Sequence, residues 1–138
     1  YKSIFRNCNF AKVTLPESNL TYTTFNECSF ALSNLKFSDF SNSQFERLNF
    51  TNTNLEHANL SFCNLKNSDF RHSCLKFINL YKINISNIKL DSAEVQQNWF
   101  IDLLGFNISS APALTNNFYI KHDTSALDIV KYTLFHKN

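Results

Sequence analysis

Apolar residues recur at every fifth position along most of the chain, without exception from Phe5 to Leu90. A small or slim side chain such as Ser3, Cys8 or Val13 stands two residues before most of them. A period of five fits neither an α-helix at 3.6 residues nor a β-strand at 2, so the pattern predicts a repeat architecture. We call these apolar residues the central residues of their repeats: Phe5, Phe10, Leu15, Leu20, Phe25, Phe30, Leu35, Phe40, Phe45, Phe50, Leu55, Leu60, Leu65, Phe70, Leu75, Leu80, Ile85 and Leu90.

The run NLEHANLSFCNL at residues 54–65 resembles the A-(D/N)-L-x-x repeat of the pentapeptide-repeat family. That resemblance implies an all-β solenoid, namely a right-handed quadrilateral (four-sided) parallel β-helix with one repeat on each side. It also implies that the central residue and the residue two before it point inward. At about twenty residues per coil, residues 1–90 would form a β-helix of about 4.5 coils.

Residues twenty positions apart would then stack in columns, and the sequence offers its own check on this arrangement. One column contains Phe10, Phe30, Phe50, Phe70 and Leu90, and the next contains Phe5, Phe25, Phe45, Leu65 and Ile85. The two facing columns are mostly leucine: Leu15, Leu35, Leu55, Leu75 and Leu20, Phe40, Leu60, Leu80. Placing phenylalanine opposite leucine keeps the volume of each layer nearly constant, as close packing of a core requires.

The fivefold pattern gives way to helical spacing after residue 90. Asp91 or Ser92 can cap a helix, and Gly105 stands where a left-handed C-terminal cap is favoured. The apolar stripe of this helix would be Val95, Trp99, Phe100, Leu103 and Leu104. We therefore expect a capping helix over residues 91–105 that covers the open end of the rod, as solenoid caps do.

Residues 106–138 are expected to form a connector followed by a second helix. The connector would be irregular as far as Asp123, because it contains breakers such as Pro112. Thr124 or Ser125 could cap the helix, and the helix would pack on the rod, on the cap or on a partner. Its apolar residues would be Ala126, Leu127, Ile129, Val130, Leu134 and Phe135.

The cysteines do not indicate a disulfide framework. Cys8, Cys28 and Cys63 fall at inward positions, where a reduced cysteine behaves as a small hydrophobic residue. A bridge between Cys8 and Cys28 is conceivable because they stack, but a reduced, cytoplasmic chain is the favoured interpretation. Cys74 falls at an outward position near His72, a pair that can supply a nucleophile and a base. No third orienting group accompanies them, so we expect no catalysis, no cofactor and no metal.

Large apolar residues also occur at outward positions, always two residues after a central residue. Stacking by twenties places Phe37, His57 and Phe77 in one column, and Tyr22 and Phe62 in the next. Exposed apolar clusters of this kind mark interaction surfaces. The predicted partner-binding residues are therefore Tyr22, Phe37, His57, Phe62 and Phe77. The alternative is that the C-terminal tail folds back and covers them.

Two segments, IKLD at 88–91 and LLGF at 103–106, resemble the end of the quinolone-resistance (Qnr) branch of the family. That resemblance implies a homodimer through C-terminal helices and an acidic rod that mimics DNA to protect gyrase. Residues 1–90 hold ten Lys or Arg and six Asp or Glu, a formal net charge of +4. Because a DNA mimic must be strongly negative, this alternative is disfavoured. Nucleic-acid binding is also not expected, because Lys66, Arg71 and Lys76 lie on successive sides.

Pentapeptide repeats also occur in effectors that bacterial pathogens secrete into host cells. The chain lacks methionine and begins within a repeat, so we expect it to be a domain of a longer protein. No apolar run is long enough for a membrane span. The sequence therefore predicts a non-catalytic protein–protein interaction module, cytoplasmic or delivered into the host cytosol as part of an effector. Its partner would be a host protein or a flanking domain.

Overall fold

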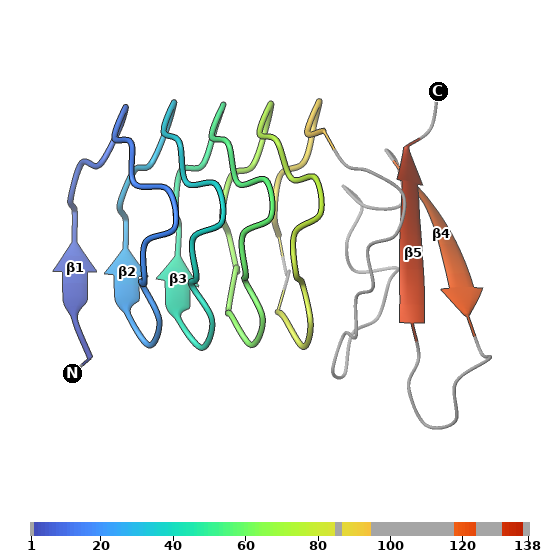
Figure 1. Ribbon diagram of the computed structural model, residues 1–138, viewed down its shortest axis with the longest axis horizontal. Coiled ribbons are helices and arrows are strands. Elements are labelled where there is room, and N and C mark those ends of the chain that lie inside the picture. Colours follow the sequence, from blue (N-terminus) through green and yellow to red (C-terminus); the bar gives the residue numbers. More distant parts are fainter. Residues whose placement is uncertain (1, 85–86, 95–117, 124–130, 137–138) are drawn as a thin grey trace.

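The computed structural model of the chain describes residues 2–84, 87–94, 118–123 and 131–136. The first two of these ranges wind into a solenoid (Figure 1). Parallel pairing joins residues twenty positions apart on each of its four sides, as in Asn9 with Ser29 and Thr14 with Asn34. This spacing confirms the predicted β-solenoid and its coil of twenty residues.

Three short strands on one side form a parallel sheet. β1 (Ile4–Arg6), β2 (Thr24–Asn26) and β3 (Gln44–Glu46) pair in the order β1-β2-β3, with Phe5 opposite Phe25 and Phe25 opposite Phe45. Backbone bonds between successive coils continue this pattern along the rod, as from the Leu55 N–H to the Cys74 carbonyl at 2.9 Å. Every coil is therefore fastened to the next through its backbone.

Each corner of a coil is a turn formed by the two residues after the central residue. The second of them always has a positive φ, between 52° at Asn7 and 64° at Lys12, through to Ser92 at 58°. The turn is closed by a hydrogen bond such as that from the Ala58 N–H to the Leu55 carbonyl, at 2.9 Å. A left-handed conformation costs most residues about 1–2 kcal/mol. None of these positive-φ residues is glycine, and none is β-branched, within the part of the chain that the structure describes.

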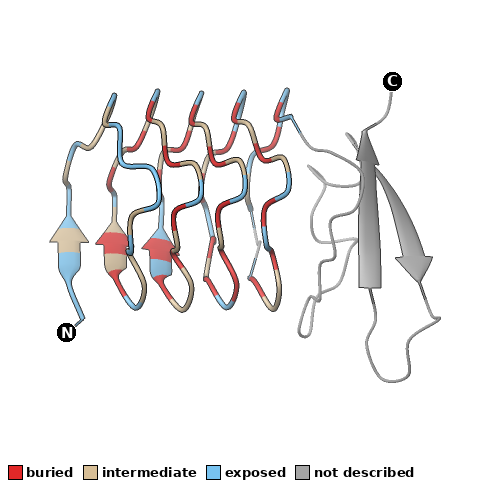
Figure 2. Ribbon diagram, viewed as in Figure 1, coloured by how far each residue is buried: buried red, intermediate tan, exposed pale blue. Residues whose placement is uncertain are grey.

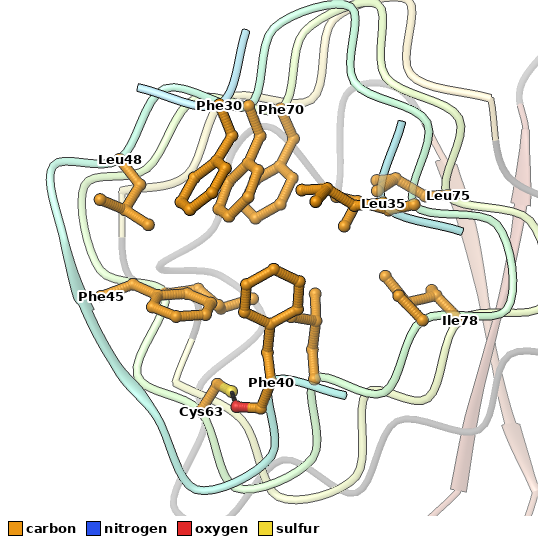
Figure 3. Close-up of a cluster of buried hydrophobic side chains, with 14 of the residues drawn as sticks. Phe30, Leu35, Phe40, Phe45, Leu48, Cys63, Phe70, Leu75 and Ile78 are labelled. Atoms are coloured by element: carbon orange, nitrogen blue, oxygen red, sulfur yellow. Dashed lines mark hydrogen bonds between the residues drawn. The ribbon is translucent and has the colours of Figure 1, made fainter. Parts of the chain in front are cut away.

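The core is built from the predicted columns. Phe30 stacks on Phe10 with 4.9 Å between ring centroids, on Phe50 at 5.5 Å, and Phe50 stacks on Phe70 at 5.0 Å. Figure 3 shows Phe30 and Phe70 in this file, with Leu35 and Leu75 in the next. The described central residues are buried from the second coil onward, whereas the first coil is more exposed (Figure 2). Leu15 of the first coil is 40% exposed. The predicted single file of phenylalanines is confirmed.

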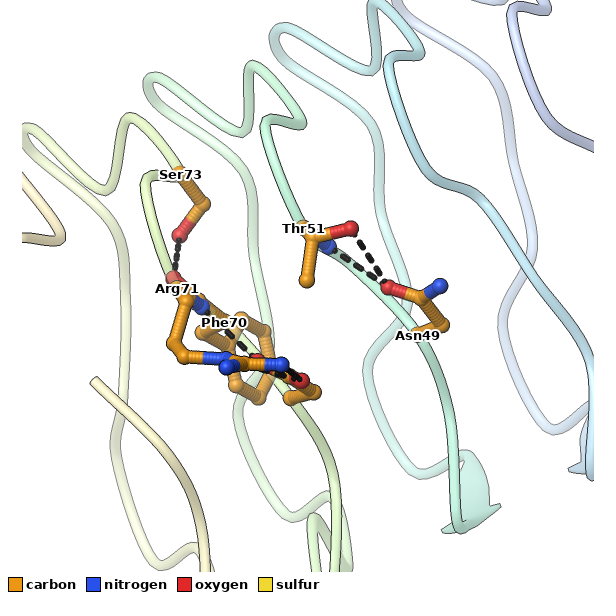
Figure 4. Close-up of polar contacts among 6 residues, drawn as sticks. Asn49, Thr51, Phe70, Arg71 and Ser73 are labelled. Atoms are coloured by element: carbon orange, nitrogen blue, oxygen red, sulfur yellow. Dashed lines mark hydrogen bonds and ion pairs between the residues drawn. The ribbon is translucent and has the colours of Figure 1, made fainter. Parts of the chain in front are cut away.

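Short polar side chains form hydrogen bonds with backbone carbonyl and N–H groups inside and along the wall of the rod. The buried hydroxyl of Thr53 donates to the Phe30 carbonyl of the preceding coil at 2.7 Å. The Ser73 hydroxyl donates to the Phe70 carbonyl at 2.6 Å, and the Thr51 N–H donates to Asn49 Oδ1 at 2.9 Å (Figure 4). Burial of these hydroxyl groups is tolerated because each is hydrogen-bonded.

The coil continues past residue 90, where the sequence predicts a capping helix. Ser92 has the corner φ of 58°, Ala93 is buried, and Glu94 pairs with Cys74 of the preceding coil. The helix prediction is therefore wrong for residues 91–94, because Ala93 serves as one more small inward residue of the repeat. The rest of the predicted helix, 95–105, lies outside the described residues.

The predicted second helix is wrong for residues 131–136, and the predicted irregular connector is wrong for residues 118–123, whereas residues 106–117 of the connector lie outside the described residues. β4 (Phe118–Asp123) pairs antiparallel with β5 (Lys131–His136), with Ile120 opposite Leu134. Both runs contain aromatic and β-branched residues, which favour strands, and the pairing gives each run a hydrogen-bonding partner. Residues 124–130 lie outside the described residues. No helix among the described residues is long and apolar enough to cross a membrane.

Candidate interaction face

Three exposed rings stack along one corner of the rod, and we call them the ring column: Phe37, His57 and Phe77. The centroid of the His57 ring lies 4.8 Å from that of Phe37 and 4.7 Å from that of Phe77, with interplanar angles of 4° and 11°. Phe37 is 52% exposed and Phe77 is 50% exposed. All three occupy the corner position with positive φ, at 58°, 59° and 55°. Both faces of the His57 ring and one face of each phenylalanine ring are covered in this way, so the column presents mainly ring edges to solvent.

The next corner carries a second aromatic group. Tyr22 is 55% exposed and Phe62 is 46% exposed, with Asn42 between them in the column. The ring of Tyr81 meets that of Phe62 edge to face, with 5.4 Å between centroids. The Lys82 ammonium lies 5.1 Å from the Tyr81 centroid, within the range of a cation–π contact.

A ladder of amide groups runs between the two aromatic corners. Asn59 Nδ2 donates to Asp39 Oδ1 at 3.1 Å, and Asn79 Nδ2 donates to Asn59 Oδ1 at 3.0 Å. Each Oδ1 also accepts a backbone N–H two residues later, as from Ser61 to Asn59 at 3.1 Å. These side chains are therefore held in place before any partner arrives. We call the whole surface the aromatic face: Tyr22, Phe37, Asp39, His57, Asn59, Phe62, Phe77, Asn79 and Tyr81.

Ion pairs flank the ring column. Lys36 Nζ lies 2.8 Å from Glu56 Oε2, and Lys76 Nζ lies 2.9 Å from Glu94 Oε2. The hydrogen bond from Lys36 lowers the pKa of the Glu56 carboxyl, and the hydrogen bond to Glu94 raises the pKa of Lys76. The Lys36 ammonium also lies 5.7 Å from the Phe37 centroid. The column is thus bordered by charges of both signs.

Two of the four cysteine thiols are buried in the rod. Burial raises the pKa of the Cys63 thiol to about 12 and also raises the pKa of Cys28. Cys74 is half-buried, and no hydrogen bond joins it to His72 within the described residues. All four cysteines are free. Among the described residues, no group of His, Cys, Asp and Glu is arranged to hold a metal ion.

The sequence located most of this face but not all of it. The predicted residues Tyr22, Phe37, His57, Phe62 and Phe77 lie on two adjacent corners. Leu32, which shares their position in the repeat, is 56% exposed on a different corner, between Lys12 and Asn52 in its column. Sequence reasoning missed Tyr81. The signal was its place one residue before Lys82, which puts it on the same corner as Phe62.

The fold and its face define a β-solenoid of five-residue repeats with a polar, partly aromatic surface. The chain belongs to the pentapeptide repeat family: residues 3–80 match the family's sequence model, described as a pentapeptide repeat region. Among curated proteins, none matches the chain.

Solved structures with this fold include a pentapeptide repeat protein from the thylakoid lumen of Arabidopsis thaliana. It is 13% identical with a TM-score of 0.55, and the match covers 67% of this chain and 60% of that one. QnrB1, a plasmid-mediated fluoroquinolone resistance protein, is 20% identical with a TM-score of 0.49, over 71% of this chain and 50% of that one. HetL, involved in heterocyst differentiation regulation in the cyanobacterium Nostoc, is 13% identical with a TM-score of 0.44, over 74% and 69%. At such identity, the similarity to the thylakoid protein establishes the fold alone.

Proposed function

We propose that this protein is a non-catalytic docking module that binds a protein partner through the aromatic face. The observation that carries the proposal is the ring column, in which Phe37 and Phe77 are about half exposed at corner positions. Membership of the pentapeptide repeat family, whose members are generally structural or interaction modules, supports a role without catalysis. The setting within a secreted bacterial effector stays a prediction.

Folding alone does not favour phenylalanine at these corners. Asparagine tolerates a positive φ better than a large apolar residue does, and it occupies the same position at Asn42, Asn52 and Asn67. An exposed ring also leaves apolar area in water, at roughly 25 cal/mol for each Å² that a partner could bury. Stacking between neighbouring rings returns only about 0.5–1.5 kcal/mol per pair. Binding of a partner would offset this cost, because it removes the exposed rings from water.

The face is also suited to binding because it is rigid. The rings of Phe37 and Phe77 are held against His57, and the side chains of Asn59 and Asn79 are held in the ladder. Side chains that are fixed beforehand lose little conformational entropy when a partner docks. Aromatic residues near the centre of an interface also contribute most of its binding energy.

The test compares two asparagine variants. A photo-crosslinking residue at position 42, between Tyr22 and Phe62 in their column, is used to identify the bound protein, which is then purified and titrated by calorimetry. Phe37→Asn with Phe77→Asn should weaken binding at least about tenfold, as expected for the loss of central aromatic residues. Leu32→Asn, at the same repeat position on another corner, is the matched control and should bind like the unmodified protein.

Circular dichroism and thermal unfolding should show that both variants keep the fold. Equal affinities for the double variant and the unmodified protein would reject the aromatic face as the docking surface. An equal loss in the Leu32→Asn variant would reject it as well, because that residue lies off the face.

A further inference from the structure

Charges at the corner of the ring column alternate in sign from one coil to the next. Lys36, Glu56 and Lys76 each stand one residue before a ring of the column, and in the first coil Glu17 occupies the ring position itself, so the signs at this corner run minus, plus, minus, plus. When such a series of four is reversed, every charge meets its opposite. The corner is therefore self-complementary in an antiparallel arrangement.

We propose that a second copy of this chain docks on the aromatic face, with the two rods antiparallel. The inference rests on the proposed function, because it uses the same surface and names its occupant. The two-fold axis would lie between the coil of Lys36 and the coil of Glu56. Lys36 then faces the partner's Glu56, and Glu17 faces the partner's Lys76. An isologous contact of this kind forms each pair twice.

The rest of the face fits the same arrangement. Phe37 lies opposite the partner's His57, so the two ring columns run side by side. On the second corner, Tyr22 lies opposite the partner's Lys82. In the ladder, the carboxylate of Asp39 lies opposite the amide of the partner's Asn59. Each of these contacts joins a group to one that it can pack against, form a cation–π contact with or hydrogen-bond.

A second copy also matches the spacing of the face. Successive coils lie about 4.8 Å apart, as parallel strands do. A rod with the same spacing can bring all four layers into contact at once, whereas a partner with another repeat distance cannot.

A parallel arrangement of the two rods is disfavoured by charge. Turning the partner about an axis along the rod would place the ring column of one copy against the Tyr22 corner of the other. Lys76 would then face the partner's Lys82, and like charges across an interface oppose association. The alternating series would also go unmatched, because the Tyr22 corner offers no series of opposite charges.

The interface would be small. Four coils and one side of the rod provide less area than the roughly 800 Å² per partner of a standard stable interface. We therefore expect weak association that depends on protein concentration and decreases as salt screens the ion pairs.

The test uses charge reversal and sedimentation equilibrium of the full chain. Lys36→Glu and Glu56→Lys, made singly, each place like charges opposite one another across the two-fold axis. Each should weaken self-association at least about tenfold, as expected for like-charge contacts made twice. The double variant Lys36→Glu with Glu56→Lys restores opposite charges and should associate like the unmodified protein.

Mixing the two single variants gives the sharpest result. The Lys36→Glu variant is negative at both positions of the pair, and the Glu56→Lys variant is positive at both. Opposite charges therefore face each other throughout a mixed pair, so two proteins that do not self-associate should form a heterodimer. A fluorescent label on one variant detects it in the centrifuge. Because each variant is already folded before mixing, a change in folding cannot produce this rescue.

Absence of the heterodimer would overturn the inference, as would a monomeric unmodified protein at millimolar concentration. Equal self-association of the unmodified protein and both single variants would also overturn it, because dimerisation would then use another surface. If self-association is absent while Phe37→Asn with Phe77→Asn still weakens binding of a crosslinked partner, only this inference fails and the proposed function stands.

Discussion

The imidazole ring of His57 lies parallel to the phenyl ring of Phe77, with 4.7 Å between their centroids and 11° between their planes. Phe37 covers the other face of the imidazole at 4.8 Å. Because these faces are covered, a partner meets ring edges and the flanking side chains. This favours edge-to-face contacts with a partner's aromatic residues over stacking on an open ring.

Corner residues should tolerate substitution according to backbone conformation. Asn52 has a φ of 55°, which glycine adopts freely and a β-branched residue does not. We predict that Asn52→Val lowers the free energy of unfolding by about 1–2 kcal/mol, whereas Asn52→Gly changes it little. Urea denaturation measures both. Equal stability of the two variants would mean that the corner conformation does not limit the side chain.

Stacked phenylalanines should contribute most to stability where they have a neighbour on both sides. Phe50 is fully buried between Phe30 and Phe70, while Phe10 in the first coil is only partly covered. Phe50→Ala should therefore lower the free energy of unfolding by about 3–5 kcal/mol. Phe10→Ala is the matched control and should have a smaller effect in the same urea titration. The reverse order would contradict the observed packing.

Arg71 should set the acid stability of the wall of the rod. Burial alone would raise the pKa of the Asp69 carboxyl, but hydrogen bonds from Arg71, including one of 2.7 Å from Nη2, lower it overall. A depressed pKa contributes stability above the unfolded value of about 3.9, and this is lost as the pH falls through the folded value. Arg71→Gln should raise the Asp69 pKa and make the loss of stability below about pH 5 shallower.

Carbon-detected NMR titration of Asp69 and urea denaturation across the acid range measure the two effects. Arg6→Gln, on another corner, is the control and should leave the Asp69 titration unchanged. An unaltered Asp69 titration in Arg71→Gln would contradict the role assigned to the guanidinium.

Thiol reactivity should follow burial. The raised pKa of Cys63, about 12, keeps this thiol protonated at neutral pH, and burial hinders access to it. We predict that iodoacetamide modifies Cys74 in the folded protein but leaves Cys63 unmodified, and that both react in urea. Mass spectrometry of tryptic peptides distinguishes them. Rapid labelling of Cys63 in the folded protein would show that the coil opens there.

Inward positions could be predicted from the sequence because every coil must fill the same core space with apolar side chains. The column from Phe10 to Phe70 follows from the twenty-residue coil that the family resemblance implies, and the separation of phenylalanine from leucine columns supports it. The same arithmetic placed Phe37, His57 and Phe77 together, since corner residues share the spacing of the core. It could not give the angle between their rings, which depends on the corner conformation. Tyr81 is also not predicted, because it is the first residue of its corner, whereas the exposed apolar residues in the pattern are second residues.

The C-terminal part could not be predicted in the same way. Lys131 to His136 contains apolar residues whose spacing fits a short helix as well as a strand. This segment is a strand because it pairs with β4. The sequence pattern predicts a connector where β4 lies, so it offers no strand for β5 to pair with. Similarly, alanine favours a helix, so the sequence alone does not show that Ala93 is buried as an inward residue of a further coil.

The corner residues, none of which is glycine across the described rod, form the surface, whereas the central residues form the core. A corner side chain that makes no contact with the adjoining layers can be exchanged for another that is not β-branched without disturbing the packed interior. Substitutions at these corners can therefore accumulate one at a time, so a rod of this kind can acquire a new binding surface while its fold stays the same.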